Sequence, residues 1–538
     1  MSSPPAERTP AWALAGLALL LAAGGAGILY LTRGTTFFQD EWSWILARRS
    51  GVGSLVHPYN QHLSLVPVAI YRVLFALAGL RHYWPYRAVS LAAELSGVTL
   101  VFLYARRRVG PWLALLAAAL IMFFGPGWQD ILWPFQMAWL ITVAAGLGVL
   151  LALDRRDRAG DVIACVLLCV AVASASPGLA VLLGVTVEVL RTRRRPWIVA
   201  VPILLYAIWW LAFEQSSILG DALLLLPRFV FDAAAGVLSS LTGVASINVS
   251  TDTGNYLTLG PALLVVALVL IGARLRRWGR IPPRVLTLIL IPLTFWVVAG
   301  TGRAATRVDG VILHFTGDEG RYLYIGAVWT LLLGVELIRG VRPRRWTLAA
   351  ATIVVGAIVL ANVSTLRAGA GLLRAQAQVT RAELGTLDMT RSQIAPSFAS
   401  SGFVFFANVT AGDYFAAEHA LGNPGATPSE IAGYANGARA VADAQLVRIQ
   451  QPTLMPVAPE PTRPCLEQHA APALAFVLPR AGVTVVSTGA PAVISLRRFA
   501  STFAPLGTLA AGHAGRLLIR DDEAPQPWHV QIASSAAI

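Results

Sequence analysis

The sequence has few charged residues, only three cysteines and no lysine. Charged residues make up 13% of its 538 residues, whereas soluble globular proteins contain about 25%. Cys165 and Cys169 lie inside one apolar segment, and Cys465 stands alone near the end of the chain. This spacing offers neither a disulfide framework nor a CxxC metal site. The composition therefore excludes an ordinary soluble globular fold and a cysteine-based scaffold.

Hydrophobic residues account for 56% of the chain and its mean hydropathy is +0.64, which is typical of a polytopic membrane protein. The net charge of +14 comes from arginines alone. Many of them form short clusters beside hydrophobic segments, at residues 106–108, 155–156, 193–195, 276–277 and 344–345. Such clusters mark the cytoplasmic ends of membrane spans. A nucleic-acid partner is therefore not expected.

Long apolar segments predict the membrane-spanning helices, since a span of about 30 Å needs roughly 20 apolar residues. They lie near residues 11–31, 86–104, 111–124, 135–153, 197–213, 256–271, 285–300, 322–338 and 346–361. Residues 161–190 contain two shorter ones, separated by the turn-forming cluster Ser174-Ala175-Ser176-Pro177-Gly178. We therefore expect about eleven transmembrane helices.

The apolar stretch 62–80 is long enough for a further span, but the arginine clusters argue against one. If the N-terminus is cytoplasmic, an additional span would place Arg106–Arg108 outside. We therefore interpret 62–80 as an interfacial or re-entrant helix on the outer face. The same count places the loops 125–134, 214–255 and 301–320, and everything after residue 362, on the outside.

The last part of the chain has the composition of a soluble domain. We divide the chain into a transmembrane module, residues 1–363, and an extracytoplasmic domain, residues 364–538. The second is expected to be α+β or β-rich. It is predicted to begin with a helix at 366–387 and to contain strands within 475–486, 491–499 and 516–519. The proline-rich stretch 451–464 is predicted to be a linker or an extended connection.

The predicted outer loops contain acidic, basic and aromatic groups on one side of the membrane. The first loop carries Asp40, Glu41, His57, Gln61 and His62; the second carries Trp128 and Asp130; the fifth carries Arg303, Arg307, Arg321 and Tyr322. A carboxylate at a membrane boundary is costly unless it is paired or solvated, and it can serve as a general base to a hydroxyl. Arginine suits a phosphate, because its planar guanidinium binds oxygens bidentately.

Several motifs resemble the GT-C superfamily of polytopic glycosyltransferases. The first helix is followed by the Asp40-Glu41 pair and by the stretch His57-Pro58-Tyr59-Asn60-Gln61-His62-Leu63-Ser64-Leu65-Val66-Pro67. Tyr83-Trp84-Pro85-Tyr86 and a helix that ends in Arg106–Arg108 come next. This layout is similar to that of protein O-mannosyltransferases and bacterial lipid-linked sugar transferases. The resemblance covers residues 11–363 and does not extend to the tail.

The resemblance implies an inverting enzyme that transfers a sugar from a polyprenyl-phosphate donor to an envelope glycan, lipid or protein on the outer face. Asp40 matches the catalytic acid of the first outer loop, where it would accept the proton of the acceptor hydroxyl, and Glu41 would assist or orient it. Arg321 and Tyr322 would hold the donor phosphate, with Arg303 and Arg307 as rivals. The remaining substrate-binding candidates are His57, Gln61, His62, Trp128 and Asp130.

The sequence indicates no definite cofactor. Members of the superfamily differ in their need for a divalent metal ion, and the acids of this chain are too scattered to predict a cage of oxygen ligands. Metal use therefore stays open, with Asp130 as the best candidate for a second carboxylate.

Each candidate residue also has a plain structural interpretation. Asp40 and Glu41 fit the first turn of a helix, which favours acids. His57 and His62 fit interfacial anchors, Trp128 fits an aromatic belt, and Arg321 fits a charge that reaches from a helix end to water. These alternatives stay open at the level of sequence.

Two other classes of function are also compatible with the sequence: a polymerase, ligase or flippase of lipid-linked oligosaccharides, and a non-enzymatic envelope scaffold. The absence of lysine together with abundant alanine and glycine suggests a high-GC bacterial genome. The expected location is therefore the bacterial plasma membrane, with several spans, a cytoplasmic N-terminus and an extracytoplasmic C-terminal domain.

Overall fold

The computed structural model describes residues 9–48, 51–60, 62–213, 220–245, 247–250, 253–308, 311–341, 343–399, 409–458, 473–520, 522 and 524–535. The chain forms two compact units. The first comprises Met1–Arg33, Ser50–Leu74 and Trp84–Leu372, and the second comprises Gly34–Arg49, Phe75–Tyr83 and Leu373–Ile538. Gly34–Arg49 and Phe75–Tyr83, which the sequence places on the outer face before the second span, thus belong to the same unit as Leu373–Ile538. Each unit is described by itself.

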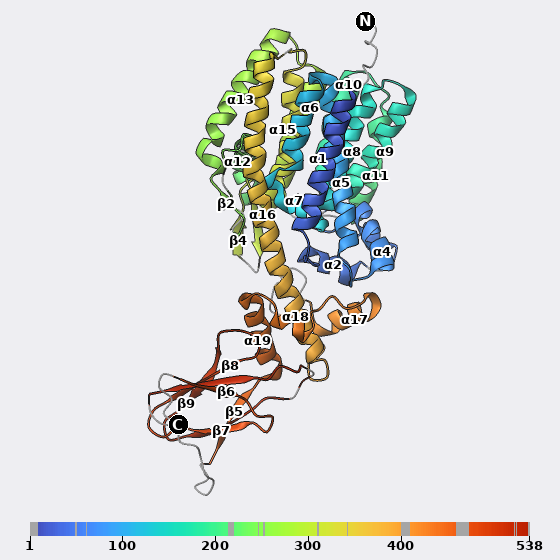
Figure 1. Ribbon diagram of the computed structural model, residues 1–538. Helices are drawn as coiled ribbons and strands as arrows, with labels where there is room; N and C mark the ends of the chain where they lie inside the picture. The colour runs from blue at the N-terminus through green and yellow to red at the C-terminus, as the bar shows by residue number, and fades with distance from the viewer. Residues whose placement is uncertain are drawn as a thin grey trace. The chain divides into compact units, whose positions relative to one another are not determined.

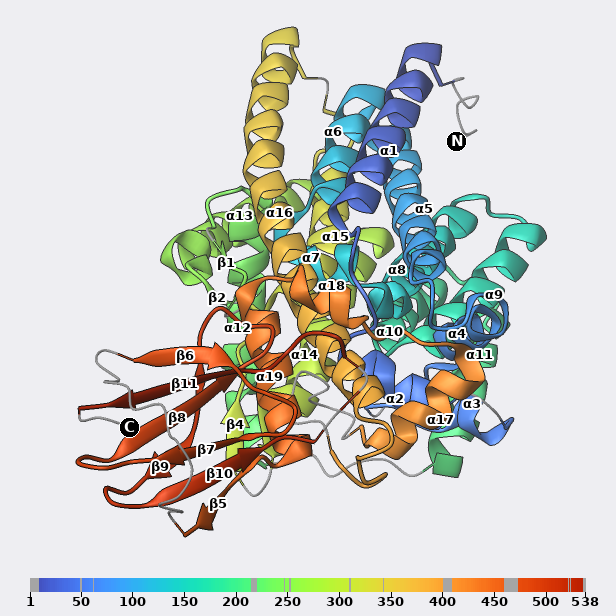
Figure 2. The same ribbon diagram turned by 60° about the horizontal axis from the view of Figure 1, so that its bottom comes forward.

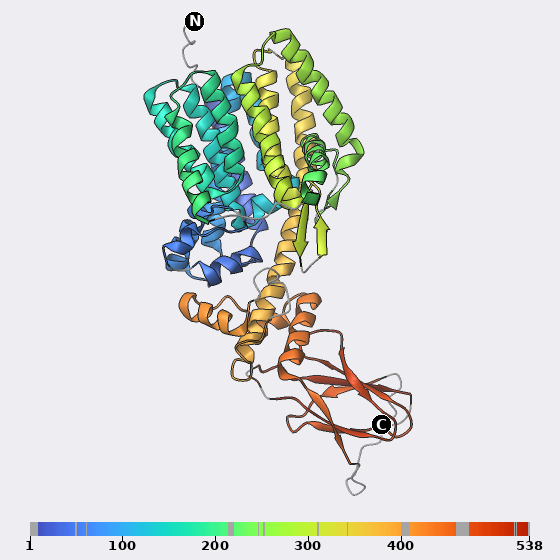
Figure 3. The same ribbon diagram turned by 180° about the vertical axis from the view of Figure 1, so that it is seen from behind.

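Long helices make up the first unit (Figure 1). Each predicted span contains one: α1 (Ala11–Leu31), α5 (Trp84–Val109), α6 (Pro111–Met122), α8 (Met137–Asp154), α9 (Arg158–Ser174), α10 (Pro177–Arg191), α11 (Trp197–Phe213), α13 (Tyr256–Trp278), α14 (Pro283–Arg303), α15 (Gly320–Leu337) and the first part of α16 (Arg345–Met389). Helices α8 to α11 lie side by side (Figure 3). The predicted break between α9 and α10 occurs at Ala175, and Pro177 begins α10 because proline is tolerated at a first helical position.

Among the described residues, seven helices are long and apolar enough to cross a membrane, or eight if the bent pair Pro111–Met122 and Gly125–Leu132 counts as one span. The predicted spans at α9, α10, α11 and α15 form helices of 17, 15, 17 and 18 residues. The predicted fold class, an all-α polytopic membrane protein with a C-terminal α+β or β-rich part, is confirmed.

Helix α4 (Leu65–Ala78) has 14 residues. At a rise of about 1.5 Å per residue it is too short for a 30 Å hydrocarbon core. This length agrees with the interpretation of residues 62–80 as something other than a span.

The prediction of one long loop at 214–255 is wrong, because helix α12 (Gly220–Leu241) occupies 22 residues of it. Asp221, Arg228 and Asp232 interrupt its apolar sequence, which hides the helix from a search for continuous hydrophobic runs. Apolar residues nevertheless recur at helical spacing, and Phe229 and Ala233 are buried on one face. The strands β1 (Ile247–Asn248) and β2 (Thr253–Gly254) follow.

A buried ionic network joins the ends of several helices in the first unit. Arg284 of α14 lies 2.8 Å from a carboxylate oxygen of Glu188 in α10 and 3.2 Å from one of Asp154 in α8. Arg108 of α5 pairs with Asp154 and with Glu336 of α15. Arg108 belongs to one of the clusters that the sequence assigns to the cytoplasmic side, whereas Arg284 stands alone in the sequence. The pairs tie together helices that are distant in sequence.

The second unit combines helices with two antiparallel sheets (Figure 2). Its strands are β5 (Thr453–Val457), β6 (Leu474–Val477), β7 (Val483–Val486), β8 (Ala492–Arg497), β9 (Ala504–Leu509), β10 (Ala514–Leu518) and β11 (His529–Ser534). One sheet has the order β5-β10-β7 and the other β6-β11-β8-β9. Strand β5 lies within the stretch predicted as a linker. Pro456 is tolerated there because β5 is an edge strand and pairs with β10 alone.

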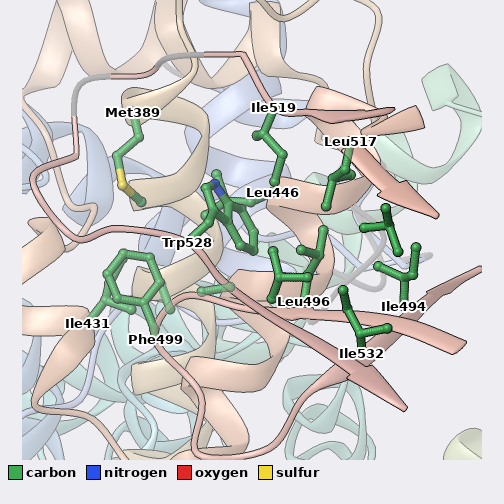
Figure 4. Close-up of a cluster of buried hydrophobic side chains, with 14 of the residues drawn as sticks. Met389, Ile431, Leu446, Ile494, Leu496, Phe499, Leu517, Ile519, Trp528 and Ile532 are labelled. Carbon is green, nitrogen blue, oxygen red and sulfur yellow. The ribbon is translucent and has the colours of Figure 1, made fainter. Parts of the chain in front are cut away.

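Helices α17 (Ala411–Leu421), α18 (Pro428–Ala432) and α19 (Asn436–Gln450) complete this unit, together with the end of α16. The predicted helix at 366–387 is the continuation of α16 rather than a separate helix. Side chains from α16, α18 and α19 meet those of the sheets in one apolar core, which includes Met389, Ile431, Leu446, Ile494, Leu496, Phe499 and Trp528 (Figure 4).

Candidate active site

The short helix α2 (Asp40–Ala47) begins with the two adjacent acids. Carboxylates are favourable in the first turn of a helix, where backbone N–H groups lack partners. Gln39, just before the acids, has a φ of 45°, a region that non-glycine residues seldom adopt. Strained backbone of this kind persists where the surrounding structure imposes it, and it gathers at functional sites.

Glu41 is fully buried, with 0% of its surface exposed. Its Oε2 accepts a hydrogen bond of 2.9 Å from the backbone N–H of Phe38. The hydroxyl of Tyr83 lies 2.9 Å from the same oxygen and 3.0 Å from Oε1. The Tyr83 ring packs edge-on against Phe37, with centroids 4.7 Å apart. Glu41 thus joins the two first-loop stretches of the second unit.

Asp40 is half-buried, in contrast to its neighbour. Of the two acids it is the more exposed. The structure therefore separates the pair into an internal carboxylate, which holds the loop, and a partly accessible one. The roles of Asp40 as catalytic base and of Glu41 as its assistant stay predictions.

In the first unit, Arg321 and Tyr322 begin α15 as predicted. The Arg321 guanidinium donates to Glu319 over 3.1 Å and lies 5.2 Å from the Tyr322 ring centroid, with 31% of its side chain exposed. Tyr322 is buried among the rings of Trp139, Phe229 and Phe295. Arg303, the last residue of α14, is close enough to interact electrostatically with the Tyr322 hydroxyl. The structure therefore gathers these three predicted phosphate-binding residues.

The loop that contains them is more ordered than the sequence suggests. Strands β3 (Ala305–Val308) and β4 (Val311–His314) form an antiparallel hairpin in which Arg307 pairs with Ile312. The side chain of Arg307 lies outside the described residues. Asp318 of the same loop interacts electrostatically with Asp232 of α12. Sequence reasoning missed Asp232 because it treated α12 as a loop.

Trp128 and Asp130 belong to the short helix α7 (Trp128–Leu132), which follows the turn η1 (Gly125–Gly127) and precedes η2 (Pro134–Gln136). Both side chains are buried, with 4% and 0% of their surface exposed. Trp128 packs against Gly369 of α16, where an added Cβ would lie 2.7 Å from the indole. This position is inside the protein, so the aromatic-belt interpretation of Trp128 does not fit.

A buried acid–phenol pair lies close to Asp130. The Tyr324 hydroxyl donates to Glu94 of α5, and Asp130 interacts electrostatically with Tyr324. Glu94 is 1% exposed. Tyr324 lies 230 residues from Glu94 in sequence, so no local spacing predicts that the two side chains meet.

The predicted histidines lie in the first unit, after the short helix α3 (Gly53–Val56). His57 is exposed, and its Nδ1 lies 3.1 Å from the carbonyl oxygen of Pro58. The ring of His62 forms a hydrogen bond with the Ser176 hydroxyl at the start of α10. His62 therefore anchors the loop to the helices. Gln61 lies outside the described residues.

The candidate residues fall into both units. Asp40 and Glu41 belong to the second, and all other described candidates belong to the first. Within the described parts of the chain, no group of three or more His, Cys, Asp or Glu side chains could hold a metal ion.

No protein-family model matches the sequence, and comparison with curated proteins finds no match. Two crystal structures of ArnT from Cupriavidus metallidurans are similar to this one. The apo form has a TM-score of 0.48 and 13% identity, covering 78% of this chain and 91% of that chain. The form bound to undecaprenyl phosphate has a TM-score of 0.46 and 13% identity, covering 76% and 89%.

Proposed function

We propose that this protein is a membrane glycosyltransferase that moves a sugar from a polyprenyl-phosphate donor to a hydroxyl of a glycan, lipid or protein. The proposal rests on the different environments of the two acids at the start of α2. Glu41 is buried and held by Tyr83 and Phe38, while Asp40 is partly accessible. A partly exposed carboxylate that an acceptor hydroxyl can approach can act as its general base, and the buried neighbour Glu41 fixes the start of the helix that carries it.

In the proposed reaction, Asp40 accepts the proton of the acceptor hydroxyl. The acceptor oxygen forms a bond to the anomeric carbon of the sugar, and the bond from that carbon to the donor phosphate oxygen breaks. The polyprenyl phosphate leaves with the electron pair of the broken bond. A single displacement of this kind inverts the configuration at the anomeric carbon.

The donor phosphate requires a cationic group that keeps its charge in a membrane environment. Arg321 and Arg303 meet this requirement, since arginine remains protonated and presents two parallel N–H groups to phosphate oxygens. Tyr322 lies beside both of them and supplies a hydroxyl donor. Arg307 is the rival for this role. His57, Gln61, His62, Trp128 and Asp130 complete the proposed set of substrate-binding residues.

The donor and the acceptor would both be used on the outer face of a bacterial plasma membrane, with the N-terminus in the cytoplasm and the second unit outside. This orientation follows from the arginine clusters beside the hydrophobic segments, one of which contributes Arg108 to the buried ionic network. A divalent metal ion stays an open partner in the reaction.

The deciding experiment measures transfer from a panel of radiolabelled polyprenyl-phosphate monosaccharides in membranes that contain the wild type or Asp40→Asn. General-base catalysis contributes roughly 10²–10⁴-fold, so the variant is expected to lose activity by that factor. Asp221→Asn is the matched control, because Asp221 is also an acid in the first turn of a helix and is exposed. Full activity of Asp40→Asn would remove Asp40 from the mechanism.

Two further arms complete the experiment. Loss of activity with a chelator, and recovery with added divalent ions, would establish metal use. No transfer from any donor by a correctly inserted wild type would overturn the proposal, in favour of a protein that handles whole oligosaccharides or serves as a scaffold.

A further inference from the structure

The tail of the chain contacts the helix that carries the acid pair. Trp42, which follows Glu41 in α2, is fully buried, and its ring lies 6.4 Å from that of Tyr414 in α17 in an edge-on arrangement. Tyr414 is also fully buried. The two residues are far apart in sequence and belong to the same compact unit. The contact therefore links the predicted catalytic loop to the predicted C-terminal domain.

Hydrogen bonds fix the position of the Tyr414 hydroxyl. Its hydroxyl lies 2.9 Å from Oδ2 of Asp388, near the end of α16, and 3.0 Å from Oδ1 of Asn423. Asn423 donates to the same oxygen of Asp388 over 2.9 Å. Arg391 pairs with the other oxygen of Asp388 over 3.0 Å. Loss of a hydrogen bond by a buried polar group costs free energy. These bonds therefore fix the position of the Tyr414 ring, which Trp42 contacts.

A second contact joins α17 to the stretch Phe75–Tyr83 of the same unit. The backbone N–H of Leu80 donates to the carbonyl oxygen of Leu421, at the end of α17, over 2.8 Å. Gly79 has a φ of +59°, and an added Cβ would lie 2.1 Å from that carbonyl oxygen. Leu80 precedes Tyr83, the residue that binds Glu41. Helix α17 therefore supports both partners of the Glu41–Tyr83 pair.

We infer that α17 positions the acid pair, with Tyr414 and Asp388 as positioning residues for the proposed transfer. They act on the reaction through Trp42, without contact with the reacting groups. The expected effect of these residues on the rate rests on the proposed function. The inference assigns the tail a role in positioning the acid pair. A tail that is only a spacer, or only an acceptor-binding module, is the alternative that the test separates.

The first test is kinetic. Because small misplacements of a catalytic group cost up to about 10²-fold in rate, Tyr414→Phe is expected to lower kcat by roughly tenfold to a hundredfold and to leave the donor KM within about twofold. Asp388→Ala should have a similar effect, and Asp388→Asn should recover most of the rate, because its amide oxygen still accepts from Tyr414. Tyr434→Phe is the control, since the Tyr434 hydroxyl has no hydrogen-bond partner among the described residues.

A glycine pair tests the second contact. Gly79→Ala places a methyl group against the Leu421 carbonyl and should lower kcat in the same way. Gly51→Ala is its control, because Gly51 has a similar φ of +80° but open space around its added Cβ. An equal effect of both substitutions would attribute the loss to backbone strain and would count against the inference.

Hydrogen exchange of the full-length protein supplies a readout independent of activity. Amides of residues 37–45 should exchange faster in Tyr414→Phe and Gly79→Ala than in the wild type and the two controls. Unchanged exchange and unchanged kcat would overturn the inference while leaving the proposed function intact. Faster exchange in a protein whose wild type transfers no sugar would support the positioning and refute the transferase function.

Discussion

The Tyr83 hydroxyl lies within 3.0 Å of both carboxylate oxygens of Glu41, although 42 residues separate the two in sequence. The stretch between them includes Ser50–Leu74, which belongs to the other compact unit. The hydrogen bonds between Tyr83 and Glu41 therefore bring two distant parts of the chain together at α2. Asp40, the more exposed of the two acids, directly precedes Glu41.

The first prediction concerns this pair. Tyr83→Phe removes the phenolic donor and leaves a buried carboxylate with fewer hydrogen bonds, which costs about 1–3 kcal/mol. We expect a lower thermal unfolding midpoint in detergent and reduced transfer activity. Tyr434→Phe should change neither. Wild-type stability and activity in Tyr83→Phe would show that Glu41 does not depend on this contact.

The second prediction concerns the donor phosphate. Arg321→Lys keeps the charge but loses the planar pair of N–H groups, so the donor KM should rise by roughly tenfold, the equivalent of about 1.4 kcal/mol of binding. Arg321→Met should raise it further. Steady-state kinetics with varied donor concentration measure both. Arg276→Lys, at an exposed helix end of the first unit, is the control. An unchanged KM in Arg321→Met would transfer the role to Arg303 or Arg307.

The third prediction concerns the buried ionic network. Arg284→Met leaves Glu188 buried without its 2.8 Å partner, and loss of one member of a buried pair costs about 3–5 kcal/mol. We expect a strongly lowered unfolding midpoint. The double variant Arg284→Met with Glu188→Leu should recover most of the loss, since it removes both charges. A double variant as unstable as the single one would contradict this explanation.

The fourth prediction concerns pH. Burial raises the pKa of the Glu430 carboxyl, but its bonds to the Thr427 backbone N–H and to Arg381 outweigh this effect and lower the pKa below its ordinary value. A lowered pKa stabilises the fold above the unfolded value of about 4.3. The contribution is lost as the pH falls through the folded pKa.

Glu430→Gln keeps the helix cap but removes the charge. The wild type should therefore be more stable than this variant at neutral pH, by about 0.2–1 kcal/mol, as is usual for an exposed pair. The difference should shrink as the pH falls from the unfolded pKa of about 4.3 through the lower pKa of the folded state. Unfolding midpoints measured across this pH range test the prediction. A difference that grows as the pH falls would contradict it.

The sequence by itself determined the class of the protein and most of its helices. Hydrophobic length is a local property, so every predicted span contains a helix, and the turn cluster around Ser176 separates α9 from α10. The start of α2 at Asp40 also follows locally, because acids stabilise the first turn of a helix. The acid pair could therefore be named as a candidate site without a structure.

The tertiary structure alone decided which of these residues meet. Helix α12 was missed because Asp221, Arg228 and Asp232 divide its apolar sequence into short runs, although the helix as a whole is long and apolar enough to cross a membrane. The contacts of Glu41 with Tyr83, of Trp42 with Tyr414 and of Glu94 with Tyr324 join residues separated by tens to hundreds of positions. Such contacts depend on how the whole chain packs, and no local pattern records them. For this reason the sequence indicates the acids, whereas the fold assigns Glu41 to the interior and leaves Asp40 accessible.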